Sequence, residues 1–397
     1  MHTSRRDFVM LTLAAGAAAV LNGPSLARAA VEGKAAKPLK ILILGGTGFL
    51  GPAVVEAARA RGHTLTLFNR GRTAKRKEEL FGEKVFPDIE KLYGNRDPQK
   101  HATDDDPTSP KGLTALEGDR TWDAVVDTSG YVPRIVSASA NLLKDRARHY
   151  TFISSVSVYT ENGAPGGDES RPVGTMKDPT VEEMGLQFEN YGPLKALCEQ
   201  AAESAFPGRA LNIRPGYIVG AGDPTDRFTY WPVRASKGGE MLAPGSADDP
   251  IQLIDVHDLG EWIVRCIENN TTGVFNALGP QTGLTIGQVL DACVQASENK
   301  PQLTWVPGAF LAQKGAGIGM EIPIWLPPEG ETAGFHRWKC EKAVAAGLTF
   351  RPVSDTVRDL MAWWKTLPEE RTSKLRAGMT PEREAEFLKA WKERAAG

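Results

Sequence analysis

The chain has 397 residues, of which 41% are hydrophobic and 24% charged, and its formal net charge at pH 7 is −2. This length allows two domains or one large α/β domain with an attached lobe. A charge this close to neutral excludes the strongly basic footprint of nucleic-acid-binding proteins, so we expect no nucleic-acid partner. The six histidines lack the spacing of metal ligands, and no metal is predicted. Four widely spaced cysteines are expected to be buried thiols. They are Cys198, Cys266, Cys293 and Cys340.

The first 29 residues have the pattern of a cleaved export signal. SRRDF (residues 4–8) resembles the twin-arginine signal, and an apolar stretch at 9–21 follows it. Small residues at Ala27 and Ala29 suit cleavage before Ala30. The apolar stretch is shorter than the roughly 20 residues of a membrane-spanning helix, so an uncleaved anchor is the less favoured alternative. We therefore expect the twin-arginine translocation machinery as a partner, an exported or periplasmic protein, and no stable membrane insertion after cleavage.

Strands and helices alternate after residues 30–38, which are expected to form a disordered linker. Strands are expected at Ile41–Leu44, Thr64–Asn69, Trp122–Gly130 and His149–Ser155, with helices at Pro52–Arg61 and 136–147. Such alternation predicts an α/β fold with a doubly wound parallel Rossmann sheet over residues 39–214. The polar segment at 72–121 is expected to be a surface insertion.

Residues 215–397 have a less regular pattern, which predicts a smaller mixed C-terminal lobe that binds substrate, with some strands returning to the Rossmann sheet. Segments 251–256 and 274–279 resemble strands, and 259–269 resembles a helix. A last helix should start with Thr380 as N-cap and Pro381 in its first turn. Its apolar face would hold Phe387, Leu388 and Trp391.

Three glycines, Gly45, Gly48 and Gly51, have the spacing GxxGxxG between the first strand and the first helix. Glycine lets the backbone approach a pyrophosphate, whose charge the N–H groups at the start of the helix stabilise. We therefore predict a dinucleotide site. Its first candidate contacts are Gly45, Thr47, Gly48, Phe49, Leu50 and Gly51.

Asn69 stands at the end of the second strand, where NAD-preferring sites usually carry an acid for the ribose hydroxyls. Arg70 and Arg72 follow it and can bind a phosphate through paired donors, so the pattern favours NADP and leaves NAD open. A loop after the third strand should touch adenine. YGNRD (93–97) suits this better than EGDR (117–120), which makes Asn95 and Arg96 the candidates.

Tyr191 and Lys195 are four residues apart and share one face of a helix. Pro193 is tolerated only in a first turn, which places Tyr191 at the start of that helix. An ammonium beside the phenol, near a positively charged nicotinamide, would lower the pKa of the tyrosine and make it a general acid–base. Ser155, at the carboxyl end of a strand, could hydrogen-bond the substrate oxygen.

With these motifs, RPGYIVG (214–220) and IDVHDL (254–259), residues 39–280 resemble an extended short-chain dehydrogenase/reductase of the NAD-dependent epimerase/dehydratase family. The resemblance implies a catalytic triad of Ser155, Tyr191 and Lys195. It also implies cofactor contacts at Thr128, Ser129 and Gly130 after the fourth strand, and at Pro215 and Gly216 near the nicotinamide. The fold often dimerises, so a homodimer is a further expectation.

Sugar dehydratases of the family place an Asp-Glu pair directly after the triad serine or threonine. This chain has Val156 and Ser157 there, which disfavours 4,6-dehydratase chemistry and leaves epimerase and reductase or dehydrogenase chemistry open.

An exported enzyme would not meet cytoplasmic nucleotide sugars, so a sugar-like or other small alcohol or ketone is expected. Epimerisation would regenerate the cofactor in every turnover. One alternative is a non-catalytic nucleotide-bound binding or regulatory protein on the same fold, and another is a simple cytoplasmic NADP-dependent reductase. The substrate-side candidates are Tyr131, Arg227, Tyr230 and Trp231. For the last three, a packed loop with an Arg-Asp bridge is an equally favoured alternative.

Overall fold

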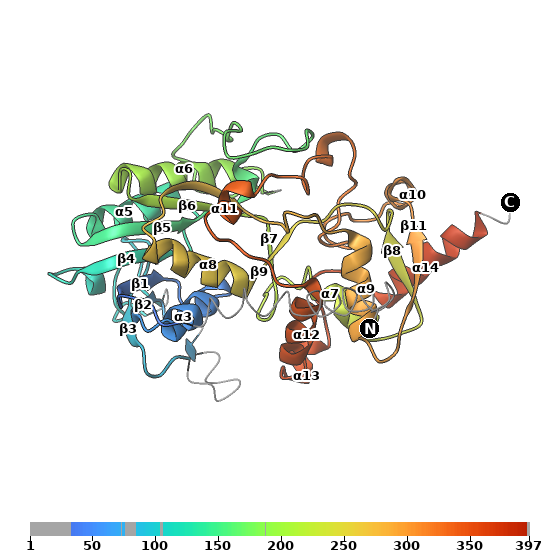
Figure 1. Ribbon diagram of the computed structural model, residues 1–397, viewed down its shortest axis with the longest axis horizontal. Helices are drawn as coiled ribbons and strands as arrows, with labels where there is room; N and C mark the ends of the chain where they lie inside the picture. The colour runs from blue at the N-terminus through green and yellow to red at the C-terminus, as the bar shows by residue number, and fades with distance from the viewer. Residues whose placement is uncertain (1–32, 73, 76–84, 104–105, 187, 395–397) are drawn as a thin grey trace, which may run out of the picture.

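The computed structural model describes residues 33–72, 74–75, 85–103, 106–186 and 188–394. The predicted export signal lies outside these ranges. The described chain forms a Rossmann half, on the left in Figure 1, and a lobe built from C-terminal segments, on the right.

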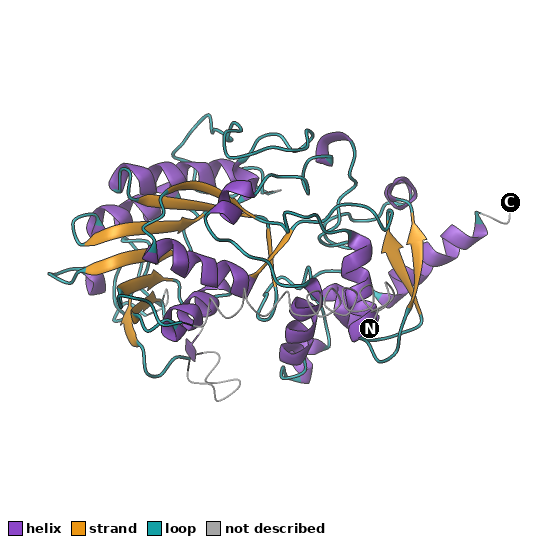
Figure 2. Ribbon diagram, in the orientation of Figure 1, coloured by secondary structure: helices purple, strands orange, loops and turns teal. Residues whose placement is uncertain are grey.

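The Rossmann half is organised around seven parallel strands in the order β10-β6-β5-β4-β1-β2-β3 (Figure 2). This confirms the doubly wound sheet, and β2 begins and ends where the sequence predicted. The strands are β1 (Lys40–Leu44), β2 (Thr64–Asn69), β3 (Glu90–Tyr93), β4 (Trp122–Asp127), β5 (Ala147–Ile153), β6 (Ala210–Pro215) and β10 (Gly273–Ala277).

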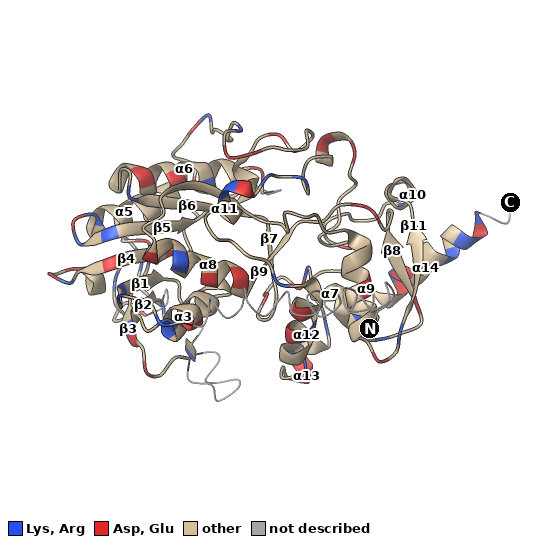
Figure 3. Ribbon diagram, viewed as in Figure 1, with Lys and Arg blue, Asp and Glu red and all other residues tan. Residues whose placement is uncertain are grey.

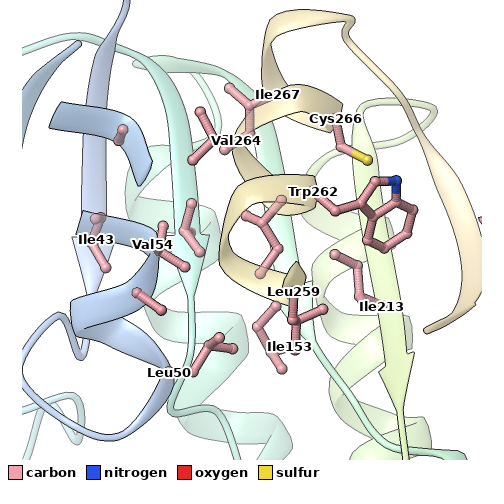
Figure 4. Packing of buried hydrophobic residues seen from close by; sticks show 14 of the residues in the cluster. Ile43, Leu50, Val54, Ile153, Ile213, Leu259, Trp262, Val264, Cys266 and Ile267 are labelled. Atoms are coloured by element: carbon pink, nitrogen blue, oxygen red, sulfur yellow. The ribbon is translucent and has the colours of Figure 1, made fainter. Parts of the chain in front are cut away.

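Helices cover both faces of the sheet because alternate residues of the buried strands point to opposite sides. Ile41 and Ile43 of β1 pack with α3 (Leu50–Ala60) and α8 (Val256–Glu268). Leu42 and Leu44 pack on the other face with α5 (Pro133–Leu143) and α6 (Tyr191–Ala205). Figure 4 shows Val54 of α3 and Trp262 of α8 in the first of these cores.

The contact between α3 and α8 joins segments about two hundred residues apart in the sequence. A Cβ added to Gly260 would lie 2.8 Å from the carbonyl carbon of Ala53, so the two helices approach closely. The prediction that 259–269 is helical is confirmed. The structure adds that this helix packs on the Rossmann sheet, and that α11 (Glu341–Ala345) contacts β10 of the same sheet.

Two expectations for the Rossmann half need correction. Part of the expected surface insertion is β3, which pairs with β2 from Thr66↔Glu90 onward. Farther along the same segment, Leu113 and Leu116 are buried around η1 (Thr114–Leu116). The polar composition of residues 72–121 gave no sign of β3, because a strand at the edge of a sheet needs few buried side chains. The described part of the linker is also held in place, since the amide of Ala35 donates to the carbonyl of Arg61 over 2.9 Å.

The C-terminal lobe begins where β7 (Tyr217–Val219) pairs with β9 (Leu253–Asp255) outside the main sheet. A second parallel pair joins β8 (Glu240–Pro244) to β11 (Gln302–Val306). Helices surround a separate hydrophobic core. The remaining elements are α7 (Tyr230–Ala235), α9 (Ile286–Ala296), α10 (Gly308–Gln313), α12 (Val353–Trp364), α13 (Glu369–Thr372), α14 (Pro381–Glu393), η2 (Val156–Val158) and η3 (Gly330–Thr332).

The last helix, α14, has the predicted start and the predicted apolar face. The Thr380 hydroxyl accepts from the amide of Arg383 over 3.3 Å, and Pro381 is the first helical residue. Phe387 and Leu388 are buried, and Trp391 packs partly buried against the same core.

All four cysteines are buried and free, as predicted. Within the described ranges, no group of three or more His, Cys, Asp or Glu side chains is placed to share a metal ion. Among the helices of the described chain, none combines the length and apolar character needed to cross a bilayer. Figure 3 shows charges of both signs scattered over the outer helices and loops in this view.

Candidate functional site

The predicted glycine turn lies between β1 and α3, at the carboxyl edge of the sheet. Gly45 has a φ of +94°, and a Cβ there would come within 2.6 Å of the Thr128 hydroxyl. A Cβ at Gly51 would lie 2.5 Å from the carbonyl oxygen of Gly45, so only glycine lets the helix start this close to the turn. Gly48 is exposed, and a Cβ there would meet nothing closer than 3.8 Å. The turn is therefore closed toward the protein and open toward solvent.

The start of α3 leaves backbone donors for a ligand. Its N-cap, Phe49, makes no side-chain cap hydrogen bond, and the first turn holds no acidic residue. The Leu50 side chain is buried in the core, so its contribution to a ligand would come from its backbone. Uncapped amides and the positive end of a helix favour an anion such as a pyrophosphate.

Asn69 supplies the observation that most directly indicates a ligand at the adenosine end. The hydroxyl of Thr47 donates to its Oδ1 over 3.2 Å. Its Nδ2 is buried without a hydrogen-bond partner among the described residues. A buried donor left unpaired costs about 1–3 kcal/mol, which a ribose hydroxyl or a ribose phosphate would offset. Arg70 and Arg72 are exposed directly after it. The residues present thus fit a dinucleotide.

The prediction that Asn95 and Arg96 contact adenine is wrong for their side chains, although both follow β3 as expected. Asn95 donates to the carbonyl of His101 over 2.8 Å and accepts from the amide of Asp97 over 3.0 Å. Arg96 forms two hydrogen bonds of 2.6 and 2.7 Å with the buried Asp127. These side chains stabilise the protein. The buried carboxylate of Asp127 would be costly without a cation beside it, so Arg96 is held there.

The three residues after β4 lie against the glycine turn and the tyrosine helix. The Thr128 hydroxyl donates to the carbonyl of Leu44 over 3.0 Å, and the Ser129 amide donates to Asp127 over 3.1 Å. The carbonyl of Gly130 accepts from the ammonium of Lys195 over 2.7 Å. The segment therefore connects the predicted cofactor turn with the predicted catalytic helix.

Tyr191 is the first residue of α6, as Pro193 predicted. A Cβ on the neighbouring Gly192 would overlap the carbonyl oxygen of Ser157, so the helix start packs tightly against η2. Ser155 is the N-cap of η2 and accepts from the amide of Ser157 over 3.1 Å. This packing brings the side chains of Tyr191 and Ser155 together at the carboxyl edge of the sheet.

Lys195 of the tyrosine helix is buried and donates to two backbone carbonyls. Its ammonium donates to the carbonyls of Gly130 and Ile153 over 2.7 and 2.6 Å, and burial lowers the pKa of Lys195 to about 8. Burial raises the pKa of Tyr191, while a hydrogen bond with Ser155 and the charge of Arg227 oppose that rise. The lowering of the tyrosine pKa by Lys195 beside a positively charged nicotinamide stays a prediction.

Two of the four substrate-side candidates lie near the tyrosine. The ring of Tyr131 is 46% exposed, and its centroid is 6.4 Å from that of Tyr191. The guanidinium of Arg227 lies 4.8 Å from the ring centroid of Tyr217. Tyr217 follows Pro215 and Gly216, of which Pro215 is buried at the end of β6 and Gly216 packs close to Leu278.

The prediction that Tyr230 and Trp231 contact substrate is wrong. They are 4% and 1% exposed and belong to the core of the C-terminal lobe. The indole of Trp231 donates to the carbonyl of Pro323 over 3.0 Å. An aromatic pair next to a glycine-rich loop has the same sequence pattern whether it faces a ligand or a core, and here the helix α7 turns it inward.

The sequence analysis missed a buried ion pair that holds the tyrosine helix. Arg214 at the end of β6 donates to Glu199 of α6 over 2.9 and 2.6 Å, and to the hydroxyl of Tyr159 over 3.0 Å. Glu199 stands four residues after Lys195, on the same face of the helix. That spacing, with an arginine in RPGYIVG, is the signal that could have predicted the pair.

Residues 41–277 match the model of the NAD dependent epimerase/dehydratase family. The chain belongs to this family. It is 23% identical to the human epimerase family protein SDR39U1, over 75% of this chain and 95% of that protein.

Solved structures share the fold of this family member. The enzyme WbmH of Bordetella bronchiseptica in complex with NAD+ superposes with a TM-score of 0.58 at 16% identity, covering 83% of this chain and 99% of that one. Human SDR39U1 (isoform2) with NADPH gives a TM-score of 0.51 at 20% identity, covering 83% of this chain and 100% of that one.

Proposed function

We propose that the protein is an NAD(P)-dependent oxidoreductase or epimerase that acts on a sugar-like or other small alcohol or ketone, with Tyr191 as general acid–base. The observation that carries this proposal is the arrangement at one sheet edge. The open glycine turn, the unpaired Nδ2 of Asn69 and the Ser155–Tyr191 pair all follow carboxyl ends of parallel strands. Parallel α/β sheets bind their ligands at that edge.

Tyr191 would exchange a proton with the substrate. In the oxidation of an alcohol, the phenolate takes the hydroxyl proton while the C–O bond becomes a carbonyl. In reduction, the phenol returns the proton to that oxygen. The Ser155 hydroxyl would hydrogen-bond the same oxygen and fix its position. When bound, the nicotinamide supplies the chemistry of accepting or donating a hydride at the substrate carbon.

Lys195 would contribute through position and charge. Its two bonds to backbone carbonyls tie the end of β5 to the segment after β4, beneath the site. Its ammonium also lies 5.0 Å from the ring centroid of Tyr131. A fixed cation near the reacting tyrosine would favour the phenolate once the site is filled and closed to water.

NADP is the cofactor that the adenosine end favours. Asn69 offers an amide where a carboxylate would repel a 2′-phosphate, and Arg70 and Arg72 follow it on the surface. The related human structure holds NADPH and the WbmH structure holds NAD+, which supports a nicotinamide dinucleotide in either form.

The amino-terminal pattern supports export by the twin-arginine route, which carries folded proteins. A cofactor bound before export would then have to be regenerated at the site, which favours epimerisation, or the paired oxidation and reduction of two substrates. Replacement of Arg5 and Arg6 by lysine should keep the protein in the cytoplasmic fraction. Unchanged periplasmic recovery would remove this part of the proposal.

Mass spectrometry of purified, denatured protein tests the cofactor and the mode of turnover together. Stoichiometric NADP or NAD released on denaturation supports self-regenerating chemistry. A site that is empty as purified but binds added dinucleotide quickly would favour a simple reductase. A protein that binds neither dinucleotide would overturn the proposed function.

A further inference from the structure

Arg227 differs from the structural arginines of this chain in how its guanidinium is used. Arg96 and Arg214 each form paired hydrogen bonds with a buried carboxylate. Arg227 uses only its Nε, which donates to the Thr225 hydroxyl over 3.1 Å. Its two Nη nitrogens have no acceptor among the described residues, and the side chain is partly exposed. The end of the guanidinium with the paired donors is therefore available to a ligand.

The loop that carries Arg227 is held firmly from behind by the C-terminal segment. Asp226, fully buried with a φ of +60°, accepts from the guanidinium of Arg371 and from the amide of Arg376 over 2.9 Å. Arg376 also donates to the carbonyl of Pro224 over 2.6 Å. A donor held in this way loses little conformational entropy when it binds.

The loop also lies within the proposed site. Arg227 stacks over Tyr217, two residues beyond Pro215, and its charge opposes the rise in the pKa of Tyr191. At the other end of the loop, a Cβ on Gly222 would lie 3.7 Å from the ring of Phe49 in the glycine turn. The loop thus approaches the glycine turn at Gly222, and the charge of Arg227 acts on the proposed catalytic tyrosine.

The neighbouring acid forms no ion pair with Arg227 within the described ranges. Asp223 is buried, and its Oδ1 accepts from the amide and the hydroxyl of Thr225 over 2.8 and 2.7 Å. Burial raises the pKa of Asp223, while its hydrogen bonds with Thr225 and the charge of Arg227 oppose that rise. A neutral sugar would leave both Nη nitrogens of Arg227 without a charged acceptor, whereas a carboxylate or phosphate would pair with both of them.

We propose that Arg227 binds an anionic group of the substrate, so that the substrate class is an acidic or phosphorylated small alcohol or ketone. This rests on the proposed function of the same site. The carboxylate or phosphate would lie a few bonds from the reacting carbon, with its oxygens on the Nη nitrogens of Arg227 and the carbinol oxygen at Ser155 and Tyr191.

Binding to NADP-loaded full-length protein tests the proposal by calorimetry, with D-glucuronate, D-glucose 6-phosphate, inorganic phosphate and D-glucose as probes. At least one anionic sugar should bind tenfold or more tightly than glucose, and R227Q should remove that difference while NADP affinity stays within twofold. R227K should restore part of the binding of a phosphate and less of a carboxylate, because lysine lacks the paired donors. This contrast tells the two anions apart.

R148Q is the matched control, since Arg148 lies near the amino end of β5 with 78% of its side chain exposed. It should bind all four probes as the unaltered protein does. Equal binding of glucose and both anionic sugars, or anion binding unchanged in R227Q, would overturn the proposal. Y191F keeps the two proposals distinct, because it should stop turnover and leave anion binding unchanged. Anion binding that depends on Arg227, together with turnover that Y191F does not lower, would reject the proposed function and leave the anion site standing.

Discussion

The glycine turn at 45–51 and the loop at 222–227 lie at the same edge of the molecule, yet different parts of the chain hold them. The turn depends on contacts with its immediate neighbours and with Thr128, which leave no room for a Cβ at Gly45 or Gly51. The loop depends on Arg371 and Arg376, about 150 residues farther along. The proposed cofactor side thus depends on its own segment and the end of the neighbouring strand, and the proposed substrate side depends on segments farther along the chain.

The two sides differ in the substitutions that they can accept. A local turn tolerates little substitution, because backbone atoms fill the space around it. A loop held by distant side chains can alter its ligand by exchanging one exposed residue while the core behind it stays the same. The two sides should therefore respond differently to mutation.

The largest effect is expected at the tyrosine that the two sides share. Y191F should lower kcat by about 10²- to 10⁴-fold, because it removes the proton-transferring hydroxyl, and leave dinucleotide affinity within about twofold. Steady-state kinetics and a dinucleotide titration measure the two effects. Turnover close to that of the unaltered protein would remove Tyr191 from its proposed role.

W231A tests whether the lobe behind the loop is a packed core. Removing a side chain that is 1% exposed should lower the free energy of unfolding by about 3–5 kcal/mol. Chemical denaturation measures this loss. A stable variant with a strongly raised KM would instead return Trp231 to the substrate site.

The pair G51A and G48A separates packing from ligand contact on the cofactor side. G51A should lower the free energy of unfolding by about 1–3 kcal/mol, since its Cβ would meet backbone atoms at 2.5 Å. G48A should leave stability nearly unchanged and weaken dinucleotide binding, because its methyl group lies on the open face. Equal losses of stability in both would contradict the geometry described for the turn.

N69D should change cofactor preference without disturbing the substrate side. A carboxylate at this position repels a 2′-phosphate and accepts from ribose hydroxyls, so the ratio of NADP to NAD affinity should fall by about tenfold. Titration with each dinucleotide measures the ratio. An unchanged ratio would show that Arg70 and Arg72 decide the preference instead.

The smallest effect concerns pH. The pKa of Lys195, about 8 in the folded protein, lies below its usual value of 10.5. Between those values the unfolded chain binds the proton and the folded one does not, so this group makes stability rise with pH. The free energy of unfolding of the unaltered protein should therefore increase relative to that of K195M from pH 8 to pH 10. A constant difference would contradict the burial of a titrating ammonium.

The sequence predicted those parts of the site that depend on neighbours in the chain. Gly45, Gly48 and Gly51 lie between a strand and a helix within one short segment, and Pro193 alone places Tyr191 at a helix start. Arg96 and Trp231 were misjudged because their partners, Asp127 and Pro323, are far away in sequence. A long polar or aromatic side chain has the same local pattern whether it meets a ligand or the protein.

The sequence by itself determined the parallel α/β sheet, the glycine turn and the place of Tyr191 at a helix start, because these follow from hydrophobic periodicity, glycine and proline over a few residues. Only the tertiary structure decided that α8 covers the sheet and that Lys195 binds backbone carbonyls. It also decided that Arg227, rather than its aromatic neighbours, is open to a ligand. Burial and pairing are properties of the packed chain, and distant segments supply them.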